Sequence, residues 1–185
     1  MSAYPHSLQN QFLIAMPQMQ DPTFAGTLTF ICDHNEHGAM GIVVNRPLTI
    51  TLHEILEQLE LDVPVPDAPV FAGGPVQTDR GFVLHHPRGR WQSSIAISDD
   101  ICLTTSRDIL AAMATDAGPR HALIALGYAG WGAGQLEQEM ASNAWLTCPA
   151  TPEILFHTAP DKKLDAALAS LGVDPHRLSG QVGHA

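Results

Sequence analysis

The chain has 185 residues, 45% of them hydrophobic, and a formal net charge of −10 at pH 7 with histidines counted as neutral. This length suffices for one substantial core, and we expect a single domain over residues 1–185. The negative charge repels phosphate backbones and argues against direct nucleic-acid binding. No apolar run reaches the roughly 20 residues of a membrane helix, and the first residues lack the basic segment of a signal peptide. We therefore expect a cytoplasmic protein without a membrane span.

The first third of the sequence predicts strands and one helix. β-branched and aromatic residues indicate strands over residues 12–16 and 27–32. The turn residues DHNEHG then lead into a third strand over 40–45, which predicts a hairpin. Thr51 and Glu54 form a T-x-x-E capping box before apolar residues at helical spacing, so we expect a helix over 51–61.

The middle of the chain predicts a further hairpin and a second helix. A short buried strand over 70–72 precedes the glycine-rich break GGPV. Strands over 81–86 and 91–98 flank the turn PRG and predict the hairpin. Thr105 and Asp108 repeat the capping-box pattern, which predicts a helix over 105–114.

The last third predicts alternating strands and helices. The expected elements are a strand over 118–130, a helix over 135–140, a strand over 144–148 ended by Pro149, and a helix over 161–171 stopped by Gly172. The segment TPEILF reads as a turn, and the tail after Gly172 as irregular. Hairpins mixed with strand–helix–strand units predict an α+β fold: a single-domain α/β sandwich with a mixed, largely antiparallel sheet and flanking helices.

The glycine-rich stretch GYAGWGAGQLEQE (127–139) invites a nucleotide-binding interpretation. Neither register fits the dinucleotide fingerprint G-x-G-x-x-G, and no lysine follows as in a phosphate-binding P-loop. Glu137 and Glu139 would also repel a phosphate at the start of the following helix. With Gly134 as the N-cap, Glu137 is placed to reach back to the backbone, so we interpret this acid as structural.

Catalytic and metal-binding motifs are absent from the sequence. There is no G-x-S-x-G nucleophile motif, and the ten histidines form no H-E-x-x-H pair. The three cysteines, Cys32, Cys102 and Cys148, are widely separated and read as small buried hydrophobic residues, with a redox role for an exposed thiol as the alternative. We expect no metal, no cofactor and no catalytic residue.

Three loop patches next to predicted strands remain as candidates for recognition. Loops at strand ends often gather at one edge of a mixed sheet, where they can frame a shallow cleft. The alternative is that their glycines and prolines only make tight turns while the tryptophans pack in the core. The candidate partner-binding residues are Asn45, Arg46 and Pro47 of NRP, Gly73, Gly74 and Pro75 of GGPV, and Gly130, Trp131, Gln135 and Trp145 of the GYAGWG stretch and its continuation. Trp131 is the expected aromatic anchor.

Several of these motifs together resemble the YqgE/AlgH family. They are LQNQFLIAMPQMQDPTFAGTLTFIC, GAMGIVVNRPL, VFAGGPVQTDRGFVLH, ALGYAGWGAGQLEQEMASNAWL and the closing GHA, in order across nearly the whole chain. The resemblance implies a single α/β-sandwich domain and a bacterial cytosolic origin, but no reaction. Some members carry the label of transcriptional regulator, which this acidic sequence, lacking a basic helix-turn-helix, supports poorly.

The sequence therefore predicts a non-enzymatic regulatory or interaction protein, a monomer or weak homo-oligomer. It would bind a protein or a small molecule through the cleft formed by the NRP, GGPV and GYAGWG loops. The first alternative is an enzyme of unrecognised type with Glu137, Glu139 or a histidine as acid or base. The second, less favoured, is a regulator that contacts DNA directly.

Overall fold

The computed structural model describes residues 7–16, 24–62, 67–87, 91–113 and 118–172. Within them, ten strands form one curled sheet with the main order β10-β1-β2-β3-β9-β6-β8-β7, and β4 and β5 extend it beside β9. The strands are β1 (Gln11–Ala15), β2 (Leu28–Asn35), β3 (Gly38–Val43), β4 (Pro47–Thr51), β5 (Pro69–Ala72), β6 (Val76–His86), β7 (Ser94–Ala96), β8 (Cys102–Thr104), β9 (His121–Gly132) and β10 (Trp145–Pro149). Among the strand pairs of the described residues, only β5 and β9 run parallel. The fold is α+β with a mixed, largely antiparallel sheet, as the sequence predicts.

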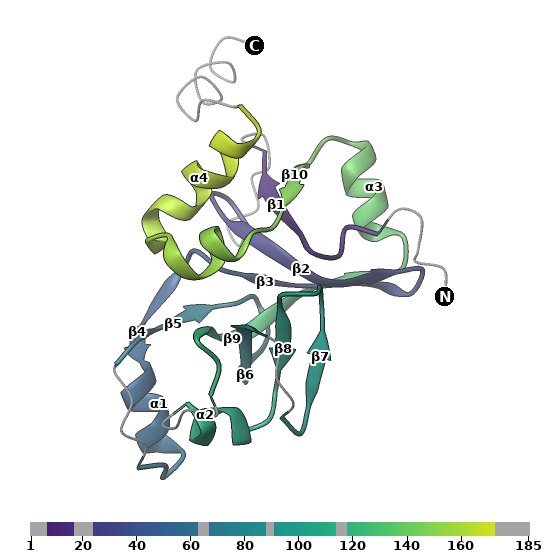
Figure 1. Ribbon diagram of the computed structural model, residues 1–185. Coiled ribbons are helices and arrows are strands. Elements are labelled where there is room, and N and C mark those ends of the chain that lie inside the picture. The colour runs from purple at the N-terminus through teal and green to yellow at the C-terminus, as the bar shows by residue number, and fades with distance from the viewer. Residues whose placement is uncertain (1–6, 17–23, 63–66, 88–90, 114–117, 173–185) are drawn as a thin grey trace.

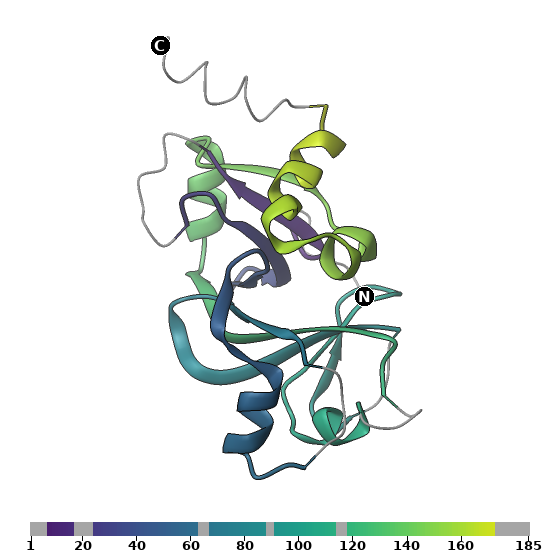
Figure 2. The same ribbon diagram turned by 90° about the vertical axis from the view of Figure 1, so that its left-hand side faces the viewer.

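The helices divide between two halves of the sheet (Figure 1). Those of the described residues are α1 (Leu52–Gln58), α2 (Asp108–Ala112), α3 (Gln135–Ala141) and α4 (Lys163–Ser170), with a π-helical turn η1 (Glu153–His157) and a 3₁₀ turn η2 (Pro160–Lys162). In Figures 1 and 2, α3 and α4 accompany β1, β2 and β10 in the upper half, while α1 and α2 lie in the lower half. None of these helices is long and apolar enough to cross a membrane.

The long strand β9 joins the two halves. Its first part pairs with β5 on one side and β6 on the other, and its last part, from Ala129 to Gly132, pairs with β3. Since side chains alternate along a strand, Leu123 and Ala125 enter a central core, whereas Ile124 enters a second core against α1 and α2. Further along, Ala129 and Trp131 belong to a third core beside α3. One apolar strand therefore organises all three cores.

The structure corrects the predicted hairpin between residues 81–86 and 91–98. β6 pairs with β9 and β8, and it is β7 that forms a hairpin with β8, with Ser94 opposite Thr104. The sequence prediction missed β8 because three residues carry too little periodicity to mark a strand. Part of the PRG turn lies outside the described residues.

Two predictions in the first third also need correction. The first hairpin exists, but β2 continues to Asn35, so its turn contains only Glu36 and His37. The NRP patch was predicted as a loop, yet Pro47 begins β4, a position in which proline needs no ladder hydrogen bond.

The predicted helices exist, but the capping boxes do not form. Thr51 and Arg107 are the N-cap residues of α1 and α2, and neither makes a side-chain cap hydrogen bond. Asp108 accepts hydrogen bonds from the Gln92 backbone N–H and the Ser106 hydroxyl instead. The helix stop is confirmed: Gly172 has a φ of +73° and donates its N–H to the Ala169 carbonyl. TPEILF is a π-helical turn, and the tail from residue 173 lies outside the described residues.

Candidate binding site

Asn45 and Arg46 of the NRP patch hold the turn that precedes β2. The Asn45 side chain accepts a hydrogen bond from Leu28 N (2.9 Å) and donates one to the Gly26 carbonyl (3.1 Å). Arg46 Nη2 donates to the Ala25 carbonyl at 2.6 Å. The two polar side chains that the sequence proposed for recognition therefore take part in the fold.

The GGPV patch lies next to the NRP patch and against β9. Ala72 N donates to the Arg46 carbonyl, and Val43 N donates to the Gly73 carbonyl, each at 2.8 Å. Gly73 and Gly74 approach the backbone of residues 127–129 so closely that a Cβ on either would overlap main-chain atoms. These glycines permit a close crossing of two backbone segments, which is a packing role.

Trp131 and Trp145 share one acceptor, the carboxylate of Glu139. Their Nε1 atoms lie 3.1 Å and 2.8 Å from Glu139 Oε1, and Gln135 Nε2 donates to Oε2 at 2.9 Å. Phe24 packs on both indoles, with ring centroids 6.0 Å and 5.5 Å away. We call Phe24, Trp131, Gln135, Glu139 and Trp145 the tryptophan cluster. Because burying an indole requires a partner for its N–H, Glu139 stabilises the cluster.

The three predicted patches are thus connected, but through a segment that the sequence prediction did not single out. Asn45 and Arg46 hold Ala25 and Gly26, and the adjacent Phe24 closes over the tryptophans. Trp131 is only 6% exposed and Trp145 4%. The expectation of Trp131 as an open aromatic anchor is therefore corrected, because the indole is covered and its N–H is already bonded. Four of the ten candidates are well exposed, namely Pro47, Pro75, Gly130 and Gln135.

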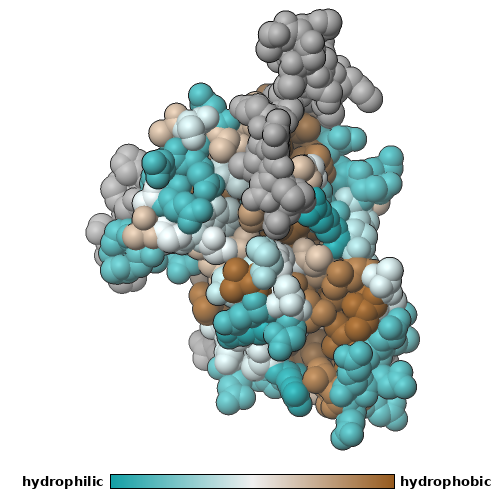
Figure 3. All heavy atoms as spheres, turned by 180° about the vertical axis from the view of Figure 1, so that it is seen from behind, coloured by the Kyte–Doolittle hydropathy of each residue, from teal (hydrophilic) through white to brown (hydrophobic). Residues whose placement is uncertain are grey.

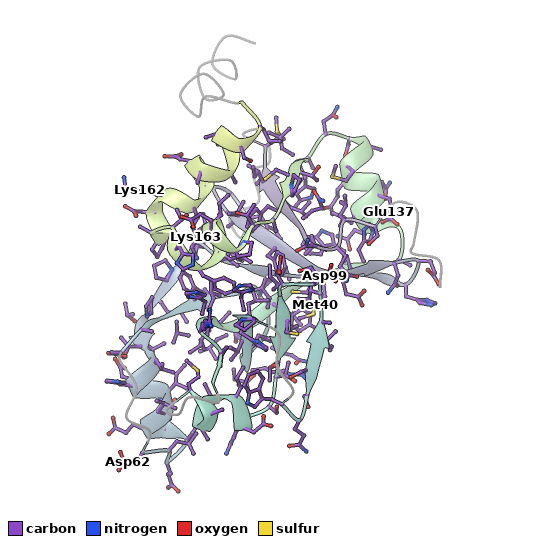
Figure 4. The ribbon with its side chains drawn as sticks, viewed as in Figure 1. Met40, Asp62, Asp99, Glu137, Lys162 and Lys163 are labelled. Carbon is purple, nitrogen blue, oxygen red and sulfur yellow. The ribbon has the colours of Figure 1, made fainter. Side chains whose placement is uncertain are left out.

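Glu137, the other proposed acid, faces a buried histidine (Figure 4 labels Glu137 on α3). Glu137 Oε1 lies 3.2 Å from His34 Nε2, and Leu8 N donates to His34 Nδ1 at 2.9 Å. Since Nδ1 accepts a hydrogen bond, the proton of the neutral ring resides on Nε2, facing the carboxylate. The contact fastens α3 to the end of β2. That Glu137 also reaches back to the backbone stays a prediction. Gly134 is the N-cap, as expected, with a φ of +74°.

An apolar groove of about 500 Å³ opens in the lower half of the molecule. Its walls come from α1 and the segment entering α2, and its floor from β6 and β9. It is lined by Ile55, Gln58, Leu59, Asp79, Gly81, Phe82, Val83, Thr104, Thr105, Ser106, Arg107, Leu110, Ile124 and Leu126. Figure 3 shows hydrophobic residues gathered in the lower half of the rear face, bordered by hydrophilic ones. The groove volume of about 500 Å³ falls within the range of roughly 300–1,000 Å³ that is typical of ligand pockets.

The groove adjoins the GGPV patch, although none of its lining residues was a candidate. Leu126 of β9 lines the groove and pairs with Ala72 of β5, the residue before Gly73. The sequence signal was present as the apolar face of the helix predicted over 51–61, with Ile55 and Leu59, but this face was interpreted as an ordinary core contact. Only the structure shows that both side chains stay partly exposed.

A smaller pocket of about 200 Å³ lies between η1 and the β5–β9 pair, and Lys163 is part of its lining. Lys163 is 2% exposed, donates Nζ–H to the Val44 carbonyl at 3.0 Å and lies 4.6 Å from the centre of the Phe71 ring. Burial lowers the pKa of Lys163 to about 8. In Figure 4 its neighbour Lys162 projects outward. Spacing offered one signal for this buried cation: Lys163 lies four residues before the buried Ala167.

Histidines and cysteines form no metal-binding group in the part of the chain that the structure describes. His86, His121 and His157 pack with ring centroids 6.1 Å and 4.4 Å apart, and within these residues no group of three or more ligand side chains is arranged to hold a metal. All three cysteines are buried, and burial raises the pKa of the Cys32 and Cys148 thiols. The thiolate, the reactive form, is therefore disfavoured at both.

Comparison with known proteins decides the family. The model of the AlgH-like family matches residues 12–176. The chain belongs to the AlgH-like family. A UPF0301 protein of Hahella chejuensis is 59% identical over 185 residues, with both chains covered in full. A UPF0301 protein of Thioalkalivibrio sulfidiphilus is 59% identical over 178 residues, which cover 95% of this chain and 96% of the relative. The predicted resemblance is confirmed.

Two solved structures share the fold of this chain. The solution structure of AlgH from Pseudomonas aeruginosa superimposes with a TM-score of 0.80 at 52% identity, over 100% of both chains. A crystal structure of a Corynebacterium diphtheriae protein has a TM-score of 0.70 at 17% identity, over 96% of this chain and 92% of that one, which shows the fold alone. The printed names of these relatives and of the two solved structures state no reaction, and a shared fold does not imply one.

Proposed function

We propose that the protein is a non-enzymatic regulatory or interaction protein that binds a protein or a small partner in the cytoplasm. One observation carries the proposal: the 500 Å³ groove is mostly apolar, and among the lining residues that the structure describes only Asp79 and Arg107 are ionisable. Acid–base or nucleophilic chemistry needs several titratable groups within reach of one reacting atom. A concave apolar surface with polar groups at its rim favours binding instead.

Two surfaces compete as the binding site. The first is the shallow cleft proposed from the NRP, GGPV and GYAGWG loops, where Pro47, Pro75, Gly130 and Gln135 are exposed. The second is the apolar groove, whose lining includes the half-buried Ile55 and Leu59. We favour the groove, because the loop patches use most of their polar groups and both tryptophans within the fold.

The enzymatic alternative finds less support in the contacts of its proposed acids. Glu139 accepts hydrogen bonds from two indoles and an amide. Glu137 lies against the buried His34 ring. Neither glutamate lines the groove or the Lys163 pocket. Direct DNA contact is the least supported alternative, because the formal charge of −10 opposes it.

A matched pair of surface variants tests the proposal and separates the two surfaces. Gly130→Gln adds a side chain to the loop surface where a Cβ meets only the Tyr128 ring edge at 3.5 Å. Ile55→Gln makes one groove wall polar. Immobilised wild-type and variant proteins are compared for partners captured from lysate and for small molecules seen in native mass spectrometry, under reducing conditions. We expect Ile55→Gln to lose a partner that Gly130→Gln retains.

The reverse result would move the site to the loop cleft. Failure of wild type to retain any partner above an unrelated acidic control protein would contradict the proposed function. Sedimentation analysis of the same samples checks the expectation of a monomer or weak homo-oligomer.

A further inference from the structure

The rim of the apolar groove carries a specific set of polar groups. β6 and β8 run antiparallel with Val83 opposite Thr104. The segments that continue from this pair bring Asp79 and the Thr105–Arg107 stretch to the same groove. Two further polar residues line the groove, Thr104 of β8 and Gln58 of α1.

Several of the nearby polar groups are already engaged. The Ser106 hydroxyl donates to Asp108 and accepts from Ser93 N. The Thr104 hydroxyl bonds to His85 and Ser94. Arg80 donates to Gln77 and lies over the Phe82 ring at 5.3 Å. These groups stabilise the rim and have less capacity left for a ligand.

Arg107 differs from its neighbours. It is exposed, and its guanidinium makes no ion pair or hydrogen bond with the described residues. A guanidinium offers donors in a planar fork that matches a carboxylate. Among the described lining residues the other ionisable group is Asp79, whose carboxylate would attract a cationic head group instead.

We propose that the groove binds a single-chain amphiphile with a carboxylate head group, such as a medium-chain fatty acid. The alkyl chain of this ligand lies against Ile55, Leu59 and Leu110, and its head group pairs with Arg107. This inference rests on the proposed function and names its ligand class.

Contacts between the apolar lining and the alkyl chain of the ligand contribute to the affinity. Ile124 and Leu126 form the floor, and the half-buried side chains of α1 form a wall. Each fully buried methylene contributes about 0.8 kcal/mol, and an open groove buries each one in part. Each two-carbon extension of the ligand should therefore tighten binding about fivefold until the groove is filled.

Three ten-carbon probes test the head-group assignment: decanoate and decyltrimethylammonium, each below its critical micelle concentration, and decanol below its solubility limit. Binding is followed by methyl NMR of the Ile and Leu residues and by calorimetry. We expect decanoate to bind tightest, with shifts at Ile55, Leu59 and Leu110 and none at Leu13 or Ile31 in the third core. Octanoate and dodecanoate give the chain-length series. Tighter binding of the cationic probe, or no dependence on chain length, overturns the proposal.

Reciprocal charge variants sharpen the test. Arg107→Gln should lower the affinity for decanoate about fivefold, as expected for an exposed charge pair, and leave the affinity for decanol unchanged. Asp79→Asn should tighten decanoate, because it removes a like charge from the rim. Arg120→Gln, at an exposed arginine outside the groove, is the matched control and should change nothing. Equal weakening of decanoate and decanol by Arg107→Gln overturns the head-group assignment.

The two proposals fail in different ways. Loss of a cellular partner by Ile55→Gln without decanoate binding to wild type leaves the binding function standing and rejects the fatty-acid inference. Decanoate binding that Ile55→Gln weakens, without any cellular partner, supports the ligand class and contradicts the regulatory function.

Discussion

The tryptophan cluster and the apolar groove lie in different halves of one sheet, and they use their residues in opposite ways. The cluster contains the distinctive residues of the sequence, and its polar atoms are paired with one another: one carboxylate satisfies two indoles. The groove combines buried apolar residues with Ile55 and Leu59, which stay partly exposed, and its Arg107 pairs with none of the described residues. The contrast teaches that an unusual motif can mark a demanding packing problem, while a binding surface can be made of residues that attract no notice.

The largest effect that tests this contrast comes from the glycines of the loop patches. Gly74 has a φ of +155°, and its Cβ would overlap the Tyr128 main chain. Gly74→Ala should therefore lower the free energy of unfolding by at least about 3 kcal/mol, measured by urea denaturation. Gly130→Ala, with room for its Cβ, should stay within about 0.5 kcal/mol of wild type. A tolerated Gly74→Ala would show that the patch is not held by this backbone crossing.

The next largest effect concerns the acceptor of the tryptophan cluster. Glu139→Ala leaves two buried indole N–H groups without an acceptor, which should cost about 2–4 kcal/mol in unfolding free energy. Glu139→Gln keeps one oxygen acceptor and should cost about half as much. Tryptophan fluorescence during urea unfolding reports both variants. Equal stability of the alanine variant and wild type would falsify the closed, hydrogen-bonded description of the cluster.

The buried Lys163, which links α4 to the end of β3, predicts an effect that depends on pH. Its folded pKa of about 8 lies below the unfolded value of 10.5. Between these two pKa values the unfolded chain binds more protons than the folded chain, so the free energy of unfolding rises with pH from about 8 to 10.5. Below pH 8 the lysine is charged in both states, and the folded protein bears the full cost of burying that charge. The gain is about 3 kcal/mol at most.

The lysine pair supplies its own control, because Lys162 and Lys163 are the only lysines of the chain. The stability difference between wild type and Lys163→Met should change by this amount from pH 7.5 to 10.5. Lys162→Met, at an exposed site, should give a flat difference. Parallel curves for Lys163→Met and wild type would assign the pH dependence to other groups.

The smallest effect belongs to the groove. Ile55→Gln replaces a half-buried side chain and should cost about 1 kcal/mol or less, whereas Leu136→Ala in the third core should cost about 2–5 kcal/mol. Thermal unfolding of both variants measures the difference. A large loss from Ile55→Gln would mean that the groove wall is part of the core rather than an open surface.

Several elements could be predicted from the sequence because their information is local. The leucines after Thr51 specify α1 through their spacing, and Gly172 ends α4 through its left-handed backbone. β8 could not be predicted, because three residues form a strand only where β6 and β7 supply the hydrogen-bond partners. The second capping box failed for a related reason: Asp108 accepts one hydrogen bond from Gln92, sixteen residues away along the chain, and one from the nearby Ser106.

The candidate site shows the same division between local and distant information. Gly134 as an N-cap, the mismatch of the glycine stretch to nucleotide-binding motifs and the family resemblance all follow from the residue pattern alone. The sharing of Glu139 by two indoles, the closing of Phe24 over them and the burial of Lys163 depend on segments that only the curled sheet brings together. The residue pattern determines which local structures form at a low cost in free energy. Whether a side chain ends as a covered partner or as the wall of an open groove depends on which distant residues pack against it, and that is decided by the tertiary structure.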